Sequence, residues 1–125
     1  MREIKFRGRI PYDKGWVYGD LRHIGNNLIY IVDKFGHGSS VNPETVGQFT
    51  GLRDSNGRDI YEGDVVQSKE LLFPYDTGVI RYCGEFTSFY LDTGDGDIND
   101  LSDDEGLTVL GNVHDNPELL EATHD

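Results

Sequence analysis

Short runs of apolar residues, separated by turn residues, recur along this chain. From residue 2 to residue 10, basic and apolar side chains alternate, which predicts a strand with one solvated and one buried face, placed at a sheet edge. Apolar runs at residues 16–18 and 28–32 predict two further strands, with turns at residues 11–15 and 25–27 between them. Two hairpins are therefore expected in the first third of the chain.

The most consistent local pattern covers residues 46–66 and predicts two strands, a tight hairpin and a third strand. Asn56 and Gly57 both tolerate positive φ, which predicts that they form the centre of a type I′ turn. Residues 62–64 signal a second turn, and the valines at residues 65–66 suit a strand that enters a core. These signals indicate architecture and say nothing about chemistry.

The tripeptide Asn-Pro-Glu occurs twice, at residues 42–44 and 116–118. It favours a helix start, because Asn can cap the free N–H groups and Pro fits the first helical position. We therefore expect a short helical turn near residue 43 and a short C-terminal helix from Asn116 to about Ala122.

Further strands are predicted at residues 77–83, 86–91 and 107–113, with Gly111 as the site of a bulge or a close backbone approach. The predicted fold is mainly β, with several short antiparallel strands in a small barrel-like or complex β fold. An α+β fold is the alternative.

Length and composition favour a single domain over residues 1–125. Because hydrophobic residues make up 36% of the chain, we expect a small core in which the seven Tyr, six Phe and one Trp take a large share. Cys83 stands alone, and no apolar run approaches the roughly 20 residues of a membrane span. These features predict a cytoplasmic protein without disulfides.

Charge divides the chain unevenly. Residues 1–62 hold nine Lys+Arg and eight Asp+Glu, net +1, whereas residues 63–125 hold two and fifteen, net −13. A surface with this balance repels phosphate backbones and anionic lipid, so direct nucleic-acid or membrane binding is disfavoured. The basic opening, with Phe6 among its cations, leaves single-stranded nucleic acid as the weaker alternative.

No pattern of catalytic, cofactor-binding or metal-binding residues stands out. A calcium loop could start at Asp95, but its sixth position is Asp100 where Gly is needed, and its twelfth is Gly106 where a bidentate Glu is needed. The scattered histidines and one thiol do not match zinc spacing. The acidic segment at residues 92–105 is therefore interpreted as a solvated loop, and we expect no enzyme, cofactor or metal.

Candidate partner-binding residues come from two groups. Aromatic side chains concentrate in the first third of the chain; core packing is the favoured interpretation for them, and an exposed subset would instead form a partner surface. The second group consists of acidic side chains that could meet a basic partner. The candidates are Trp16 and Tyr18 from the first group, and Asp95, Asp97, Asp103 and Asp104 from the second.

Three segments together resemble the YopX family of small phage and prophage proteins: MREIKFRG at residues 1–8, NPETVGQFTGLRDSNGRDIYEGDVV at residues 42–66, and VLGNVHDNPELL at residues 109–120. GWVYGDL at residues 15–21 is also similar to the pattern of many members. The resemblance implies a mostly β fold, a phage or prophage source and self-association. It implies no biochemical activity.

Two functions follow as hypotheses. The first is a non-enzymatic phage or prophage accessory protein that acts through contacts with a host or phage protein and forms a homo-oligomer. The alternative is an acidic DNA mimic that occupies a host nucleic-acid-binding protein, which the net charge of −13 over residues 63–125 suggests.

Overall fold

The computed structural model describes residues 3–12, 15–25, 28–96, 98–101 and 106–120. The chain forms two compact units, Met1–Phe49 and Thr50–Asp125, here called the N-terminal unit and the C-terminal unit. The boundary falls inside strand β5 (Asn42–Arg53). Whether residues 1–125 behave as the one domain expected from the sequence stays a prediction.

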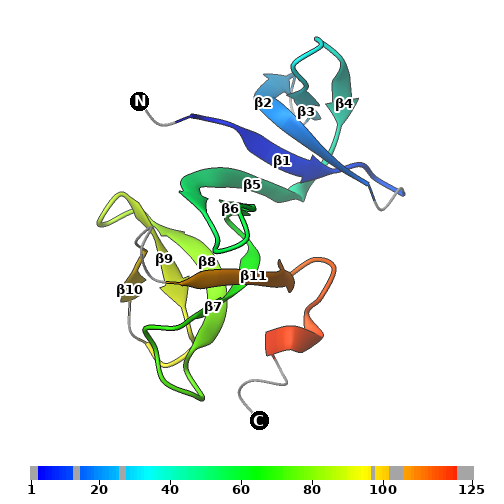
Figure 1. Cartoon of the computed structure of the whole chain (residues 1–125). Coiled ribbons are helices and arrows are strands. Elements are labelled where there is room, and N and C mark those ends of the chain that lie inside the picture. Colours follow the sequence, from blue (N-terminus) through cyan, green and yellow to red (C-terminus); the bar gives the residue numbers. More distant parts are fainter. Residues whose placement is uncertain (1–2, 13–14, 26–27, 97, 102–105, 121–125) are drawn as a thin grey trace. The chain divides into compact units, whose positions relative to one another are not determined.

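The N-terminal unit is built on antiparallel strands. Strands β1 (Phe6–Arg9), β2 (Trp16–Ile24), β3 (Leu28–Val32) and β4 (Gly38–Ser40) line up in the order β4-β3-β2-β1-β5 (Figure 1). The hairpins β1–β2 and β2–β3 confirm the two that were expected in the first third of the chain.

The predicted edge position and solvated basic face of the first strand are wrong. Strand β1 pairs with β2 on one side and with β5 on the other, so it lies inside the sheet. Arg7 is 6% exposed and its guanidinium carbon lies 4.7 Å from the centre of the Trp16 ring, whereas Ile4 is 66% exposed. Stacking on an aromatic face lets an arginine side chain be buried where an alternating pattern assigns it to solvent.

The predicted helical turn near residue 43 is also wrong, because Asn42-Pro43-Glu44 begins strand β5. Locally the tripeptide behaves as a cap: the Asn42 side chain accepts the Glu44 N–H at 3.2 Å, and the Thr45 hydroxyl donates to the Asn42 carbonyl at 2.6 Å. The same hydroxyl accepts the Arg9 N–H of β1 at 2.9 Å, which ties the segment to the neighbouring strand. The segment therefore continues as a strand and not as a helix, and the pairing of β1 with β5 shifts register between Arg7 and Arg9.

The C-terminal unit contains a second sheet. Its strands are β7 (Asp64–Ser68), β8 (Thr77–Cys83), β9 (Ser88–Asp92), β10 (Ile98–Asp100) and β11 (Leu107–Asn112), in the order β10-β9-β8-β7-β11, and the short β6 (Asp59–Tyr61) pairs with β5. These elements confirm a mainly β fold, and the two strands predicted at residues 77–83 and 86–91 pair as the hairpin β8–β9. Both sheets have two ends among the described residues, so neither closes into the small barrel that was one form of the prediction.

The core of the C-terminal unit is largely aliphatic. Ile60, Val66 and Ile80 are fully buried and pack with Leu91 and Leu107. Among the described aromatic residues, those that are buried are Phe49, Tyr61 and Phe89. The prediction that aromatic side chains make up much of the core is therefore wrong, because β-branched residues of β7 and β8 occupy the interior positions.

The hairpin between β5 and β6 is present, but its turn differs from the predicted type I′. The Gly57 N–H donates to the Asp54 carbonyl at 3.0 Å, so Ser55 and Asn56 are the central residues. Gly57 follows them with a φ of 82°. Asn56 does not have the positive φ that a type I′ turn requires of its central residues. The Asp54 side chain imposes this turn, because its Oδ1 accepts the N–H groups of Asn56 and Arg58, both at 2.9 Å.

The end of the chain follows the prediction closely. Gly111 lies at a register shift of β11, which confirms the expected bulge. A Cβ there would come within 2.4 Å of the Asn116 side-chain amide oxygen, so the close approach is to a side chain. Residues 118–120 are helical, and the rest of the predicted helix to Ala122 lies outside the described residues. Within the described segments, no helix is long and apolar enough to cross a membrane.

Candidate functional site

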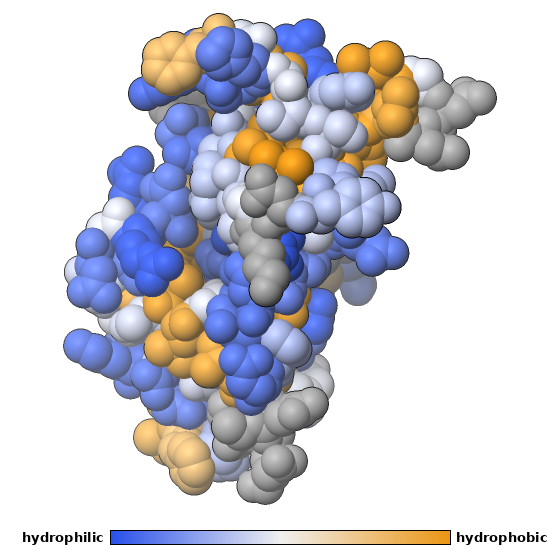
Figure 2. Space-filling view, turned by 90° about the vertical axis from the view of Figure 1, so that its right-hand side faces the viewer, coloured by the Kyte–Doolittle hydropathy of each residue, from blue (hydrophilic) through white to orange (hydrophobic). Residues whose placement is uncertain are grey.

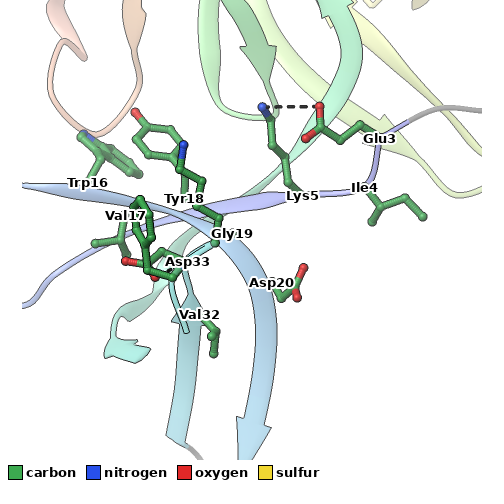
Figure 3. Close-up of a pocket in the computed structure, with 12 residues that line it drawn as sticks. Glu3, Ile4, Lys5, Trp16, Val17, Tyr18, Gly19, Asp20, Val32 and Asp33 are labelled. Atoms are coloured by element: carbon green, nitrogen blue, oxygen red, sulfur yellow. Dashed lines mark hydrogen bonds and ion pairs between the residues drawn. The ribbon is translucent and has the colours of Figure 1, made fainter. Parts of the chain in front are cut away.

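The N-terminal unit carries an open groove of about 670 Å³ (Figure 3). Its lining comes from the segment before β1, from β2, from the end of β3 and from the turn after β3. Apolar side chains supply much of the surface: Ile4, Trp16, Val17, Tyr18, Val32 and Phe35. We refer to this site as the aromatic groove.

Strand geometry places Trp16 and Tyr18 together. Side chains two residues apart on a strand project from the same face, and Figure 3 shows both rings on one side of β2. Arg7 is the cross-strand partner of Tyr18 and reaches diagonally to the Trp16 ring. Trp16 is half-buried by this contact, whereas Tyr18 is 47% exposed and accessible to a partner.

Gly19 allows the backbones of β2 and β3 to come close beneath the groove. A Cβ at this position would lie 2.0 Å from the Val32 carbonyl oxygen, and φ is 155°, a value that favours glycine. A larger residue would push the two strands apart. Gly19, the second glycine of the GWVYGDL segment, is therefore required by the shape of this site.

Asp33 builds the turn that presents Phe35. Its Oδ1 accepts the N–H groups of Phe35 and His37, both at 2.9 Å, and the Gly36 N–H closes the turn on the Asp33 carbonyl at 3.0 Å. The His37 N–H bond is the main reason that the pKa of the Asp33 carboxyl is lowered. The turn leaves Phe35 73% exposed at the edge of the groove.

Charged side chains around the aromatic groove are largely engaged with neighbours. Lys5 Nζ lies 3.7 Å from a Glu3 carboxylate oxygen and 4.8 Å from the Phe49 ring centre, and Lys34 Nζ lies 5.3 Å from the Phe35 ring centre. A carboxylate with a lowered pKa, such as Asp33, is a weak general base near neutral pH. The arrangement is suited to holding apolar side chains within a rim of mixed charge.

Comparison with known proteins gives the relationship of the chain. The profile of the YopX protein family matches residues 5–121. The chain belongs to the YopX family. The crystal structure of protein EF1440 from Enterococcus faecalis is similar to it, with a TM-score of 0.58 and 23% identity over 96% of this chain and 99% of the other. Among curated proteins, no sequence matches.

The acidic candidate residues of this YopX-family chain fall in the C-terminal unit, and one of them is described. Asp95 is exposed, and its Oδ1 accepts the hydroxyl of the buried Thr93 at 2.9 Å, which gives it a local structural role. Asp97, Asp103 and Asp104 lie outside the described residues. In the part of the chain that is described, no group of three or more His, Cys, Asp and Glu side chains could hold a metal ion.

A smaller cavity of about 290 Å³ lies in the C-terminal unit, lined in part by Ser68, Leu91 and Asn99. The Asn99 amide already donates to the Leu91 carbonyl at 3.1 Å, and Ser68 Oγ accepts the Glu70 N–H at 3.2 Å. Cys83 is half-buried at the end of β8 and does not line either cavity. Because the polar groups of Asn99 and Ser68 already form hydrogen bonds within the protein, we interpret the smaller cavity as structural.

The structure brings the two aromatic candidates together and adds residues that sequence reasoning missed. Core packing was the favoured interpretation of the early aromatic residues, and it is wrong for Tyr12, Tyr18 and Phe35, which are all exposed. Ile4 and Asp33 were not singled out. An Asp two residues before an aromatic in a Gly-rich loop was the available signal for a turn that displays Phe35.

Proposed function

We propose that this YopX-family chain is a non-enzymatic phage or prophage accessory protein that acts in the cytoplasm through protein–protein contacts and self-associates. The observation that carries the proposal is the aromatic groove, with Tyr18 and Phe35 exposed beside the half-buried Trp16. Tyr and Trp are enriched where protein partners meet, because they offer large contact areas at low conformational cost.

Capture from host lysate tests the groove. A bait carrying Tyr18→Ala should lose a partner that the parent retains, because the substitution removes an exposed ring from the groove. Tyr12→Ala is the matched control, since Tyr12 is exposed in the same unit and does not line the groove. Retention of every partner by both Tyr18→Ala and Trp16→Ala would contradict the proposal.

A DNA mimic is the second candidate, and charge is the observation that favours it. The C-terminal unit holds four Lys+Arg and eighteen Asp+Glu, net −14. Several of its carboxylates serve local structure: Asp54 and Asp64 accept backbone N–H groups within turns, and Asp92 accepts the Arg81 guanidinium at 2.8 Å. Such carboxylates are placed by the needs of turns and strand pairs, which argues against the regular rows that imitate phosphates.

Neutralising the acidic segment separates the two functions. The quadruple variant Asp95→Asn, Asp97→Asn, Asp103→Asn and Asp104→Asn should leave groove-dependent capture unchanged. A mimic would lose affinity for its basic host partner, and the remaining binding would depend less on salt, because the Debye length is about 10 Å at 0.1 M. Loss of every partner in this variant, with a normal melting temperature, would favour the mimic.

A further inference from the structure

A second apolar feature lies in the C-terminal unit, on the loop between β7 and β8. Leu72 and Phe73 are adjacent in sequence and are 85% and 81% exposed, and Tyr75 is 44% exposed. We call these three residues the apolar tip. Large apolar side chains that cluster in water mark interaction sites more often than isolated ones do.

The loop that carries the tip is held at its base. The Ser68 N–H donates to the Asp76 carbonyl at 2.8 Å, and the Gln67 amide donates to the Asp76 carboxylate at 3.1 Å. A further turn joins the Tyr75 N–H to the Leu72 carbonyl at 3.0 Å. A closed loop of this kind presents its side chains with little further ordering, which reduces the entropy lost on binding.

Tip and groove are complementary in character. The aromatic groove, at about 670 Å³, lies within the roughly 300–1,000 Å³ that binding pockets span. Its exposed lining includes Ile4, Tyr18 and Phe35, which suits aliphatic and aromatic side chains such as Leu72 and Phe73. Figure 2 shows one face of the protein, on which apolar atoms form separate patches in a largely hydrophilic surface.

Charge selects which surfaces of two copies can meet. The N-terminal unit holds seven Lys+Arg and five Asp+Glu, net +2, against net −14 for the C-terminal unit. Two C-terminal units repel each other, whereas a C-terminal unit of one copy and an N-terminal unit of another carry opposite net charge. Association is therefore favoured when unlike units of two copies face each other.

We infer that the apolar tip of one copy docks in the aromatic groove of a second copy. The inference rests on the proposed function and specifies the occupant of the groove. Where a pair of copies makes this contact once, one tip and one groove stay free, and the contact repeats until a ring closes or a filament grows; where a pair makes it twice, a closed dimer forms. The same contact hides both apolar surfaces from water.

Complementary variants test this contact by sedimentation velocity. The parent should form dimers or larger oligomers at micromolar concentration. A tip variant, Leu72→Ser with Phe73→Ser, and a groove variant, Tyr18→Ala with Phe35→Ser, should each be monomeric, because each lacks one half of the contact. Mixed in equal amounts they should form a dimer, since one intact tip meets one intact groove and the chain of contacts stops there.

Exposed positions outside both surfaces serve as controls. Phe86→Ser in the C-terminal unit and Tyr12→Ala in the N-terminal unit should keep the parent mass, because both side chains are exposed and neither belongs to the tip or the groove. Melting curves report folding, and the single variants Phe73→Ser and Phe35→Ser replace a double variant that fails to fold.

Two results would overturn the inference. If the two variants stay monomeric when mixed, the tip of one copy does not dock in the groove of another. If the parent is a monomer at all concentrations, the groove takes no second copy and the self-association in the proposed function fails as well; a host protein that is still captured through Tyr18 would then leave standing the proposal that the groove binds a protein partner.

Discussion

The two units of the chain bury different kinds of side chain. In the C-terminal unit, fully buried aliphatic residues such as Ile60, Val66 and Ile80 form a contiguous core. The described part of the N-terminal unit buries three hydrophobic side chains, Ile31, Val41 and Phe49, together with the polar Arg7 and Thr45. The C-terminal unit has an ordinary hydrophobic core, whereas the N-terminal unit relies more on stacking and hydrogen bonds.

This difference accounts for where the candidate site lies. Burial of apolar surface is the main favourable term in folding, so apolar side chains that stay in water in the folded protein can still add stability when a partner covers them. The N-terminal unit leaves Ile4, Tyr18 and Phe35 exposed around a groove while stacking Arg7 on Trp16. A unit with that distribution is suited to gain stability from a partner. The C-terminal unit also exposes apolar side chains, such as Leu72 and Phe73, but it has a contiguous buried core of its own.

The largest expected effect tests the core of the C-terminal unit. Ile80→Ala should reduce the free energy of unfolding by about 2–5 kcal/mol, because a fully buried side chain leaves a cavity. Ile24→Ala is the same chemical change at a 53% exposed position of β2 and should cost no more than about 0.5 kcal/mol. Urea denaturation measures both. Equal costs would remove the contrast between core and surface.

Asp54 should be the most important polar residue of the C-terminal unit. Its Oδ2 accepts the Val109 N–H of β11 at 3.0 Å, in addition to the two N–H groups of its own turn. Asp54→Ala leaves these donors without their acceptor and should cost on the order of 3 kcal/mol in urea denaturation. A cost near zero would show that water replaces the carboxylate.

The same carboxylate predicts a pH dependence. Burial by itself would raise the pKa of Asp54, but the N–H groups of Val109, Arg58 and Asn56 outweigh it and hold the pKa below its ordinary value. The stabilisation is therefore fully present above the unfolded-state pKa of about 3.9 and is lost as the pH falls through the lower folded-state value. Asp54→Asn should show a shallower loss of stability in acid than the parent. Parallel acid profiles would contradict this assignment.

Gly57 tests the turn that joins β5 to β6. Gly57→Val should cost roughly 1–3 kcal/mol, because φ is 82° there and a β-branched side chain is strained at that value. Ser55→Ala should be mild, since the Ser55 backbone N–H keeps its 2.8 Å bond to the Leu107 carbonyl. Thermal melts compare the two variants with the parent. A Gly57→Val melt that matches the parent would show that the turn adapts.

Arg7 tests the claim that stacking supports the N-terminal unit. Arg7→Ala should cost about 1–2 kcal/mol, because it removes a buried cation from the Trp16 face. Arg22→Ala, at an exposed position of β2, is the control and should be close to neutral. The quenching of Trp16 fluorescence by iodide should also increase in Arg7→Ala. An unchanged melting curve together with unchanged quenching would contradict the claim that stacking supports the N-terminal unit.

The smallest expected effect is that of calcium. Millimolar calcium should not raise the melting temperature beyond the effect of sodium chloride at matched ionic strength, because Asp100 and Gly106 occupy positions that need Gly and Glu. A specific rise of several degrees would identify a cation site in the acidic segment of the C-terminal unit.

Sequence reasoning recovered elements with local causes. Strand β8 was predicted with the observed bounds, and the strands around the β5–β6 hairpin follow from alternating apolar residues bounded by turn residues. Trp16 and Tyr18 could be grouped in advance, because side chains two residues apart share a strand face. Ile4 and Phe35 could not be added to them, because they reach the groove from segments that the sheet brings together.

The repeated Asn-Pro-Glu shows what the sequence by itself determined and what required the tertiary structure. The two copies form different short-range bonds: the Asn42 side chain accepts the Glu44 N–H at 3.2 Å, whereas the Asn116 side chain accepts the Asn112 N–H at 3.3 Å. At residues 116–118 the chain continues into helix, with the Leu119 N–H donating to the Asn116 carbonyl at 3.1 Å. At residues 42–44 a neighbouring strand is available: Asn42 pairs with Arg9, and the Arg9 N–H bonds Thr45. Local signals determined that each copy forms short-range bonds, and the contacts made by distant residues decided whether a strand or a helix followed.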